Sequence, residues 1–482
     1  MQSVPDEACP NIKATNEIRT FNVAAPLGLF AVHIFDVETH VPNGIIDEIS
    51  AQKELKGRSR TKDFLGVDVT TAIEPENLTR VPSVLDLFAA PGGLSEGFRE
   101  AGYRIIAAVD NDKWGCETLS HNLGPDGTIV IQGDIEKLTI RGRVDVVVGG
   151  PPCQSFSRIG KPKINHLIKY NGRKRFIDDR RNKLYKHFIR VVDALRPKFL
   201  VMENVPGMLS FQDGRIKDQV LEDFRGVGYE TDVRILNAAD YGVPQIRKRA
   251  IFIGNRIGVT NPFPRGTHYD PLRAENADEA NIEERSRCLT IFDAISDLPP
   301  LAPGKGEDEI EYPRVSELTP YQRWAREGSA KLYNHVARKH SERDRKLFRL
   351  LEPGQTIVDL PKRLRPYRSD IFKDKIRKQR WDRPSTAILA HMQKDGLMYV
   401  HPDRDQARSF TPREAARLQS FRDRYRFIGL GKILQQFRQI GNAVPPLGAQ
   451  AIALAIKPFL EPLKVPIIHY ERTASRARSN DS

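Results

Sequence analysis

One of the four cysteines lies in a loop that is suited to nucleophilic chemistry. Cys153 follows the sequence GGPP (149–152) and precedes Gln154 and Ser155. The two prolines fix the backbone immediately before the thiol, and the glycines leave room for a substrate beside it. A lone cysteine is more often a small buried apolar residue. The polar loop around Cys153 favours a nucleophile instead.

Charged side chains that could assist this nucleophile follow or precede other apolar runs. Glu203 closes the next predicted strand, so it should lie beside Cys153, where a partly desolvated carboxyl group can stay protonated and act as a general acid. Gln245, Arg247 and Arg249 alternate before a further strand. Alternation would place these three on one face, as a clamp for an anion or a carbonyl oxygen. For each group, a solvated charge at a strand end is the alternative interpretation.

A second set of residues suits a nucleoside cofactor. The segment DLFAAPGG (86–93) joins a predicted strand to a predicted helix, and its glycines let a cofactor approach the backbone. Asp110 ends the next strand, where a carboxylate can accept hydrogen bonds from ribose hydroxyls. After the third strand, Asp134 could accept from an adenine amino group while Ile135 packs on the ring. The turn lacks the G-x-G-x-x-G spacing of a pyrophosphate site, so S-adenosylmethionine fits better than a dinucleotide.

These residues fall at the ends of short apolar runs that alternate with helical periodicity. The pattern predicts an α/β fold with a mostly parallel sheet flanked by helices. The expected strands span 84–88, 105–109, 128–132, 144–148, 199–202, 231–236 and 250–253. The expected helices span 94–101, 113–122, 183–195, 412–421 and 447–460.

The pattern of apolar runs also divides the chain into segments. Residues 1–80 carry no chemical motif and are an N-terminal extension of unknown role. Residues 81–255 are expected to form the catalytic and cofactor-binding domain, and the charged, proline-punctuated residues 256–407 a second, smaller domain. Apolar helical patterning returns over 408–462, and the basic tail 463–482 is expected to be disordered.

Charge and cysteine usage narrow the class of protein. The formal net charge of +14 and the isoelectric point near 9.5 favour an anionic partner, most often a nucleic acid. Two segments, 158–183 and 362–383, carry ten lysines and arginines each. The cysteines lack the spacing of a zinc site, and no acid or histidine cluster predicts a metal. Without a signal peptide or a membrane-spanning apolar run, the chain is expected to be a soluble intracellular protein.

Six blocks, taken in order, resemble the DNA (cytosine-5) methyltransferases of the bacterial modification type. They bracket the chain from about residue 83 to residue 460 and comprise 86–93, 149–157, 203–205, 245–249, 413–421 within TPREAARLQSF, and QIGNAVPP at 439–446. The resemblance implies the Rossmann-like fold of S-adenosylmethionine-dependent methyltransferases, with 256–407 as a target-recognition domain. It also implies that the helix 447–460 returns to the catalytic sheet.

The resemblance further implies a mechanism and a set of site residues. The Cys153 thiolate would add to carbon 6 of a flipped-out cytosine in duplex DNA, which activates carbon 5 for methylation. Glu203 would hold the ring nitrogen N3, and Arg249 would bind O2 with Arg247 as a support. The substrate-binding positions would be Gln154, Ser155 and Gln245. The matching cofactor-binding positions are Phe88, Pro91, Gly93, Asp110, Asp134, Ile135, Pro152, Leu184 and Asn442.

Two positions depart from the family pattern. Ala90 stands where the family has the first glycine of the cofactor turn, which adds a methyl group where space is tight. Ala387 stands where a threonine is usual, so a DNA-contacting hydroxyl would be absent or supplied by Thr386. Neither change removes a catalytic group.

Two other functions stay open at this point. An RNA cytosine-5 methyltransferase has a similar cofactor turn, but its nucleophile usually occupies the position of the Glu203 block. A catalytically silent DNA-binding homologue would be signalled by the loss of Cys153 or Glu203, and both are present. We expect double-stranded DNA as the partner, a cognate restriction endonuclease that acts separately, a monomeric enzyme, and a cytoplasmic location at the nucleoid.

Overall fold

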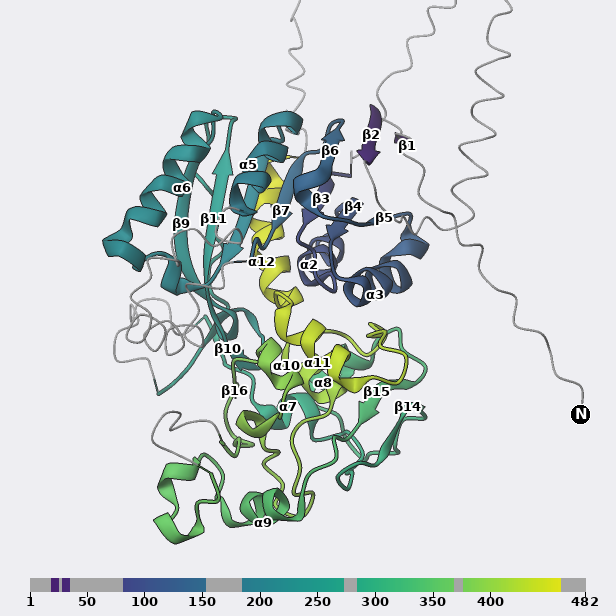
Figure 1. Cartoon of the computed structure of the whole chain (residues 1–482), viewed down its shortest axis with the longest axis vertical. Helices are drawn as coiled ribbons and strands as arrows, with labels where there is room; N and C mark the ends of the chain where they lie inside the picture. Colours follow the sequence, from purple (N-terminus) through teal and green to yellow (C-terminus); the bar gives the residue numbers. More distant parts are fainter. Residues whose placement is uncertain are drawn as a thin grey trace, which may run out of the picture.

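The computed structural model describes residues 19–25, 28–34, 81–152, 184–272, 284–367 and 376–460. A seven-stranded sheet with helices on both faces forms the upper part of the molecule (Figure 1). A second region of short helices and two-stranded sheets lies below it in the same view. The α/β class with a mostly parallel sheet, predicted from the alternating apolar runs, is confirmed.

The large sheet has the strand order β5-β4-β3-β7-β8-β11-β9. The strands from β5 to β8 are parallel, and β11 is antiparallel to both of its neighbours. Strand β3 is buried along its whole length, as expected of a parallel strand covered on both faces. The seven expected strands are confirmed with ends shifted by a residue or two: β3 Ser83–Leu87, β4 Arg104–Asp110, β5 Ile129–Gln132, β7 Val146–Gly149, β8 Phe199–Asn204, β9 Glu230–Asn237 and β11 Lys248–Asn255.

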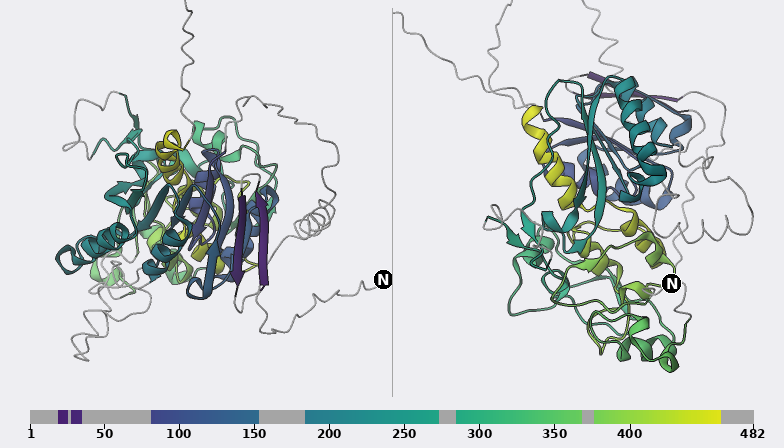
Figure 2. Two further views of the ribbon diagram at one scale, coloured as in Figure 1. Left: turned by 90° about the horizontal axis from the view of Figure 1, so that it is seen from above. Right: turned by 90° about the vertical axis from the view of Figure 1, so that its left-hand side faces the viewer.

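Two layers of helices cover the sheet. On one face, α2 (Gly93–Glu100) and α12 (Pro446–Ile456) share an apolar cluster with the strands, and α3 (Lys113–Leu123) lies on the same side. On the other face, α5 (Leu184–Leu195) and α6 (Arg215–Gly226) pack through residues such as Phe188 and Phe224. Figure 2 shows α12 and α6 on opposite sides of the strands.

The end of the chain returns to the first domain. Helix α12 packs against α2, and a Cβ on Gly97 would lie only 2.4 Å from the Pro446 carbonyl oxygen. Gly97 therefore allows the two helices to approach closely. The return of the last helix to the catalytic sheet, implied by the resemblance, is confirmed.

The second region has its own apolar core. The cluster is formed by α7 (Ile291–Ile295), α8 (Pro320–Arg326), β15 (Leu332–Val336), α10 (Pro412–Leu418) and α11 (Ile433–Asn442). Helix α9 (Glu342–Leu350) packs in a separate cluster at the far end. The remaining small strands are β10 Gln245–Ile246, β12 His268–Tyr269, β13 Ser286–Arg287, β14 Gly306–Ile310 and β16 Ser385–Thr386.

Within the N-terminal extension, β1 (Arg19–Ala25) and β2 (Gly28–Ile34) form an antiparallel hairpin. Strand β2 also pairs with β6 (Leu138–Arg141) of the first domain. The sequence pattern predicted neither this pairing nor β6. The extension therefore contributes a hairpin to a three-stranded sheet at the side of the domain.

Helix α10 carries the TPREAARL block, and its arginines are structural. Thr411 and Glu414 form a capping box at its start. Arg417 is fully buried and pairs with Asp423 at 2.6 Å and with Asp297 at 2.5 Å. Removing one partner of such a buried pair would leave an uncompensated charge, so these contacts fix the fold of the second region.

Candidate active site

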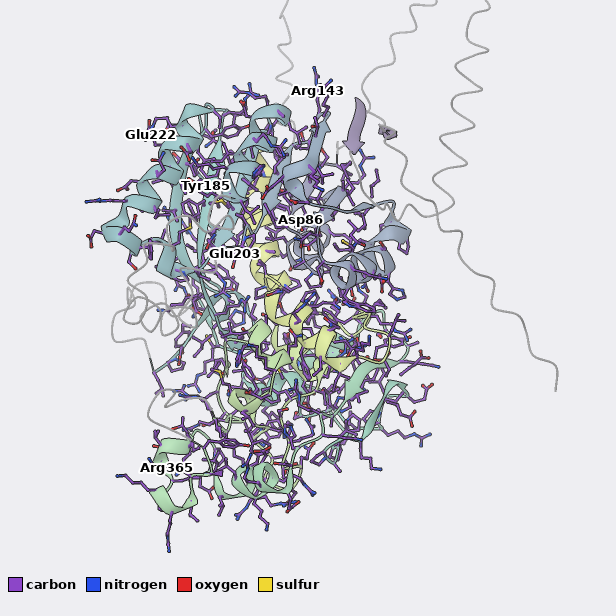
Figure 3. All side chains as sticks on the ribbon, in the orientation of Figure 1. Asp86, Arg143, Tyr185, Glu203, Glu222 and Arg365 are labelled. Atoms are coloured by element: carbon purple, nitrogen blue, oxygen red, sulfur yellow. The ribbon has the colours of Figure 1, made fainter. Side chains whose placement is uncertain are left out.

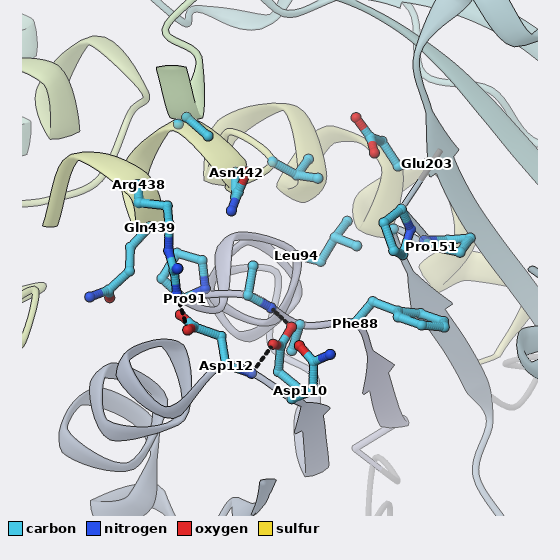
Figure 4. A pocket seen from close by; sticks show the side chains of 18 of the residues that line it. Phe88, Pro91, Leu94, Asp110, Asp112, Pro151, Glu203, Arg438, Gln439 and Asn442 are labelled. Atoms are coloured by element: carbon cyan, nitrogen blue, oxygen red, sulfur yellow. Dashed lines mark hydrogen bonds and ion pairs between the residues drawn. The ribbon is translucent and has the colours of Figure 1, made fainter. Parts of the chain in front are cut away.

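A cavity of about 920 Å³ opens at the carboxyl ends of β3, β4, β7 and β8. The sheet order reverses there, because the chain runs outward through β4 and β5 on one side and through β7 and β8 on the other. Open α/β sheets bind ligands at this kind of position. The end of α11 closes the cavity from the second region, and Figure 4 shows Asn442 facing the acids at the end of β4.

The turn between β3 and α2, residues 88–92, is strained and held by hydrogen bonds. Phe88 and Ala90 have positive φ angles of 57° and 51°, a conformation that costs about 1–2 kcal/mol for a residue with a Cβ. The Ala90 amide donates to Asp110 Oδ2 at 2.7 Å, and the Asp112 amide donates to Asp110 Oδ1 at 2.7 Å. Burial raises the pKa of Asp110. Asp110 thus orders the turn while its carboxylate lines the cavity.

Eight of the nine residues expected at the cofactor line this one cavity. They come from the ends of β3, β4, β5 and β7 and from α5 and α11. They are Phe88, Pro91, Asp110, Asp134, Ile135, Pro152, Leu184 and Asn442.

Gly93 is the exception, and the reason expected for it was wrong. It does not line the cavity. A Cβ at this position would lie 2.0 Å from the Val444 carbonyl oxygen. The glycine is therefore needed for the approach of the C-terminal segment, and it supports the cavity wall formed by that segment.

Glu203 and Arg249 form an ion pair at the opposite end of the cavity. Arg249 Nε lies 2.6 Å from Glu203 Oε1, and both side chains are nearly buried. A Cβ on Gly150 would lie 3.3 Å from Glu203 Oε2, so this glycine leaves room for the carboxylate. Figure 3 places Glu203 between the sheet and the second region. Glu203 was expected beside Cys153, which lies outside the described residues, and Gly150 of the loop before Cys153 lies close to it.

Arg247 has a supporting role, as the resemblance implied, through main-chain contacts that the sequence did not predict. Its Nη1 donates to the Ile388 carbonyl at 2.5 Å, and its Nη2 donates to the Ala443 carbonyl at 2.9 Å. Burial, with the nearby charge of Arg249, lowers the pKa of Arg247 to about 9. Arg247 borders the cavity, but it joins the residue before β11 to two distant segments of the wall. The structure thus favours the supporting role over the clamp on an anion or a carbonyl oxygen that alternation predicted.

Gln245 does not face the cavity, and the expected common face with Arg247 and Arg249 is wrong. Alternation fails because the strand is interrupted at Arg247: Gln245 lies in β10, which pairs with β16, while Arg249 lies in β11. The Gln245 side chain is fully buried and donates to the Leu418 carbonyl at 3.0 Å. It joins the sheet to α10 and does not meet a substrate.

The predicted nucleophile Cys153 and its neighbours Gln154 and Ser155 lie outside the described residues, as does the basic segment 158–183. Pro152 directly precedes Cys153 and lines the cavity. The preceding Pro151 carbonyl accepts a hydrogen bond from Asn204 Nδ2 at 3.3 Å. Asn204 is nearly fully buried and orients this loop.

Two charged residues of the cavity were not predicted from the sequence. Arg438 from α11 pairs with Asp112, both residues line the cavity, and a dashed line joins them in Figure 4. Arg438 directly precedes the QIGNAVPP block, and Asp112 follows Asp110 by two residues. Their proximity to known motif positions was the only available signal.

Comparisons with known proteins identify the family. The family of C-5 cytosine-specific DNA methylases matches residues 83–458. The type II methyltransferase M.DdeI of Desulfomicrobium norvegicum is 37% identical over 79% of this chain and 89% of its own length. The type II methyltransferase M1.HphI of Haemophilus parahaemolyticus is 36% identical over 77% of this chain and 86% of its own length. The chain therefore belongs to the C-5 cytosine-specific DNA methylase family.

A solved structure agrees with this assignment. The prophage-encoded DNA modification methyltransferase of E. coli has a TM-score of 0.57 and 25% identity, and covers 79% of this chain and 99% of its own. The prediction of a DNA (cytosine-5) methyltransferase, preferred over an RNA enzyme or a silent homologue, is confirmed. Among the described residues, no helix is long and apolar enough to cross a membrane, and no cluster of acids, cysteines and histidines could hold a metal.

Proposed function

We propose that this enzyme methylates carbon 5 of a flipped-out cytosine within a specific duplex sequence, using Cys153 as nucleophile and S-adenosylmethionine as methyl donor. One observation carries the proposal. A single cavity holds Asp110 and Asp134 at one end and the Glu203–Arg249 pair at the other. Pro152, the residue before Cys153, lines the same cavity. A nucleoside cofactor and a target base can therefore meet in it.

The cavity residues fit S-adenosylmethionine. Carboxylates accept hydrogen bonds from ribose hydroxyls and an adenine amino group, and they would repel the phosphates of a dinucleotide. Phe88 and the buried Ile135 supply apolar walls for the adenine ring. When bound, S-adenosylmethionine supplies a methyl group carried on a positively charged sulfur. Asp110 and Asp134 would hold the nucleoside and thereby direct that methyl group toward the base.

Three side chains, Cys153, Glu203 and Arg249, would carry out the protein's part of the reaction. The Cys153 thiolate forms a bond to carbon 6, and the π electrons of the ring move to carbon 5. Glu203 holds the N3 edge of the ring. Arg249 Nε lies 2.6 Å from Glu203 Oε1, and Nη1 donates to the Lys248 carbonyl, so Nη2 would be the donor to O2. After carbon 5 is alkylated, its proton leaves, the sulfur–carbon bond breaks, and the thiolate is restored.

The second region is suited to hold the duplex. We assign residues 256–407 to target recognition and 81–255 to the catalytic domain, and leave 1–80 and the tail 463–482 outside both. Of the segment 408–462 that was expected to return to the catalytic domain, α10 and α11 pack in the core of the second region, and α12 packs on the catalytic sheet. Basic residues of α9, such as Arg343 and Lys346, are exposed. Arg365 lies at the far end of the region, well below Glu203 in Figure 3. Phosphate contacts from exposed residues such as Arg343 and Lys346 would supply the salt-dependent part of DNA affinity.

The biological setting is proposed from the relatives. Both relatives named above are type II methyltransferases. We infer that this chain protects DNA from a cognate endonuclease that acts separately, and that it works as a monomer in the cytoplasm at the nucleoid. Extrusion of the target base costs a few kcal/mol, which one catalytic unit can recover from its contacts with DNA.

Trapping with 5-fluorocytosine tests the covalent step. Fluorine cannot leave carbon 5 as a cation, so the bond between Cys153 and carbon 6 would persist after methyl transfer. Long duplex DNA amplified with 5-fluoro-dCTP should form a denaturant-resistant adduct with the enzyme in the presence of S-adenosylmethionine. Cys153→Ser should form none, and Cys288→Ser, which replaces a buried thiol elsewhere, should still form it. An adduct with Cys153→Ser would contradict the proposal.

A further inference from the structure

The turn between β3 and α2, residues 88–92, is called the cofactor turn here, and its backbone conformation needs contacts from other parts of the chain. Phe88, Ala90 and Gly92 all have positive φ angles. Such a backbone is disfavoured for residues with a Cβ and persists where surrounding contacts over-determine it. The first domain supplies Asp110, which accepts from the Ala90 amide. The second support comes from a residue more than 330 positions along the chain.

Tyr425 is that second support. Its hydroxyl donates a hydrogen bond to the Pro91 carbonyl. A Cβ on Gly92 would lie 2.6 Å from the same hydroxyl, so the glycine makes room for it. Burial raises the pKa of Tyr425 well above its ordinary value, and the nearby Glu96 charge acts in the same direction. The hydroxyl therefore keeps its proton and remains a donor.

Tyr425 is itself fixed from the second region. Arg413 of α10 donates from Nη2 to the Tyr425 carbonyl at 2.8 Å. The tyrosine ring packs against Phe421 and Phe427, with ring centroids 4.8 and 5.6 Å away. Tyr425 is fully buried, so its ring has a single environment. The Tyr425 carbonyl is thus bonded to α10, and its hydroxyl is bonded to the cofactor turn.

Neighbouring residues hold α2, the helix that continues the turn. Arg424 Nη2 lies 2.8 Å from Glu96 Oε1, and Arg422 Nη2 lies 3.3 Å from Glu100 Oε2. Asp423 points the other way and pairs with Arg417 of α10. The segment 422–425 therefore joins α10 to α2 and to the cofactor turn.

We propose that Tyr425 is a positioning residue for cofactor binding, whose hydroxyl sets the conformation of the cofactor turn through the Pro91 carbonyl. The inference rests on the proposed use of S-adenosylmethionine. It assigns a role to a residue that touches neither the cavity nor the target base. It also means that the fold of the second region, through α10, contributes to cofactor affinity.

Calorimetric titration with S-adenosylmethionine tests this role. Tyr425→Phe keeps the ring and removes the donor, and its Kd should rise about five- to tenfold, the effect of losing one buried hydrogen bond. The matched control is Tyr229→Phe. Tyr229 is also buried and donates to a main-chain carbonyl, that of Pro197 at 2.6 Å, so the control loses the same kind of bond without touching α10 or the turn. Its Kd should stay that of the wild type.

Steady-state kinetics should separate positioning from general damage. For Tyr425→Phe, KM for S-adenosylmethionine should rise while kcat at saturation stays within about twofold of wild type. Equal Kd values for Tyr425→Phe and wild type would overturn the inference, as would an equal rise for Tyr229→Phe. If Tyr425→Phe folds poorly, Arg424→Gln must raise Kd in the same direction. A wild type that binds no S-adenosylmethionine would instead refute the proposed cofactor and, with it, this role.

Discussion

Arg249 Nε lies 2.6 Å from Glu203 Oε1, and the pair joins two neighbouring antiparallel strands, β8 and β11. Both groups come from strand ends that face the cavity. The pairing orients two groups that could hold neighbouring positions, N3 and O2, on one edge of the cytosine ring. Both charged groups are largely removed from water, and the pairing gives each of them a partner of opposite charge.

Breaking this pair should abolish most methyl transfer. Glu203→Ala should lower the single-turnover rate by about 10²–10⁴-fold, the range for loss of a positioned acid–base group. Arg249→Ala should cause a comparable loss, and the two effects should not add because the residues act together. The exposed pair Glu222–Arg225 on α6 offers a control, and its removal should leave the rate unchanged. Full additivity of the two site substitutions would contradict a shared role.

Ala90 should be a strained position. Its φ of 51° suits glycine, so Ala90→Gly should raise the free energy of unfolding by about 1 kcal/mol. Denaturant melts would measure the change. Ala89→Gly is the control, because Ala89 is buried but does not have a positive φ, and it should lower stability. A destabilised Ala90→Gly protein would show that the methyl group packs usefully in the turn.

Gly93 should tolerate no side chain. Because a Cβ there would lie 2.0 Å from the Val444 carbonyl oxygen, Gly93→Ala should displace the C-terminal segment and lower both Tm and cofactor affinity. Gly226→Ala, at the end of α6 with open space around it, should leave Tm unchanged or raise it. Thermal melts of the two variants make the comparison. Equal Tm values would refute the close approach.

His401 should make the protein less stable in acid. Burial is the main cause that lowers the pKa of this fully buried residue to about 3, so the folded state keeps it neutral. The unfolded chain takes up a proton as pH falls below about 6.5, so through this residue stability falls by about 1.4 kcal/mol per pH unit below that point.

Comparison with His401→Asn isolates this contribution. Between pH 6.5 and pH 5 the wild type should lose more stability than the variant, whatever the stability of either protein at pH 7.5. Urea melts at four pH values suffice. Parallel curves for the two proteins would mean that His401 titrates equally in the folded and unfolded states.

The sequence predicted elements and motif positions well because both depend on local patterns. Buried β-branched runs located all seven strands of the large sheet, and strand ends located Asp110, Asp134 and Glu203. The roles expected for Gln245 and Gly93 failed, and the contacts of Arg247 were not predicted, for one reason. Their partners, among them Leu418, Ile388 and Val444, lie more than 100 residues away, and no local pattern reports such contacts.

The lack of a local signal for contacts between distant residues also explains why some residues were missed. The pairing of Arg438 with Asp112 and the hydrogen bond from Tyr425 to Pro91 each join the two regions of the molecule. Helices α6, α7, α8 and α9 were also missed, as was α11, which ends in Gly441 and Asn442. Gly441 is needed there because a Cβ would lie 2.2 Å from the Ala390 nitrogen.

The most direct test of the central claim is a map of 5-methylcytosine across the genome of a host that lacks cytosine-5 methylation. The chain and its Cys153→Ser variant would be expressed separately, with Cys288→Ser as a matched control. We expect 5-methylcytosine at one short duplex motif with the wild type and with Cys288→Ser, and none with Cys153→Ser. Unmarked DNA in cells that contain folded wild-type protein, or methylation by Cys153→Ser, would contradict the account.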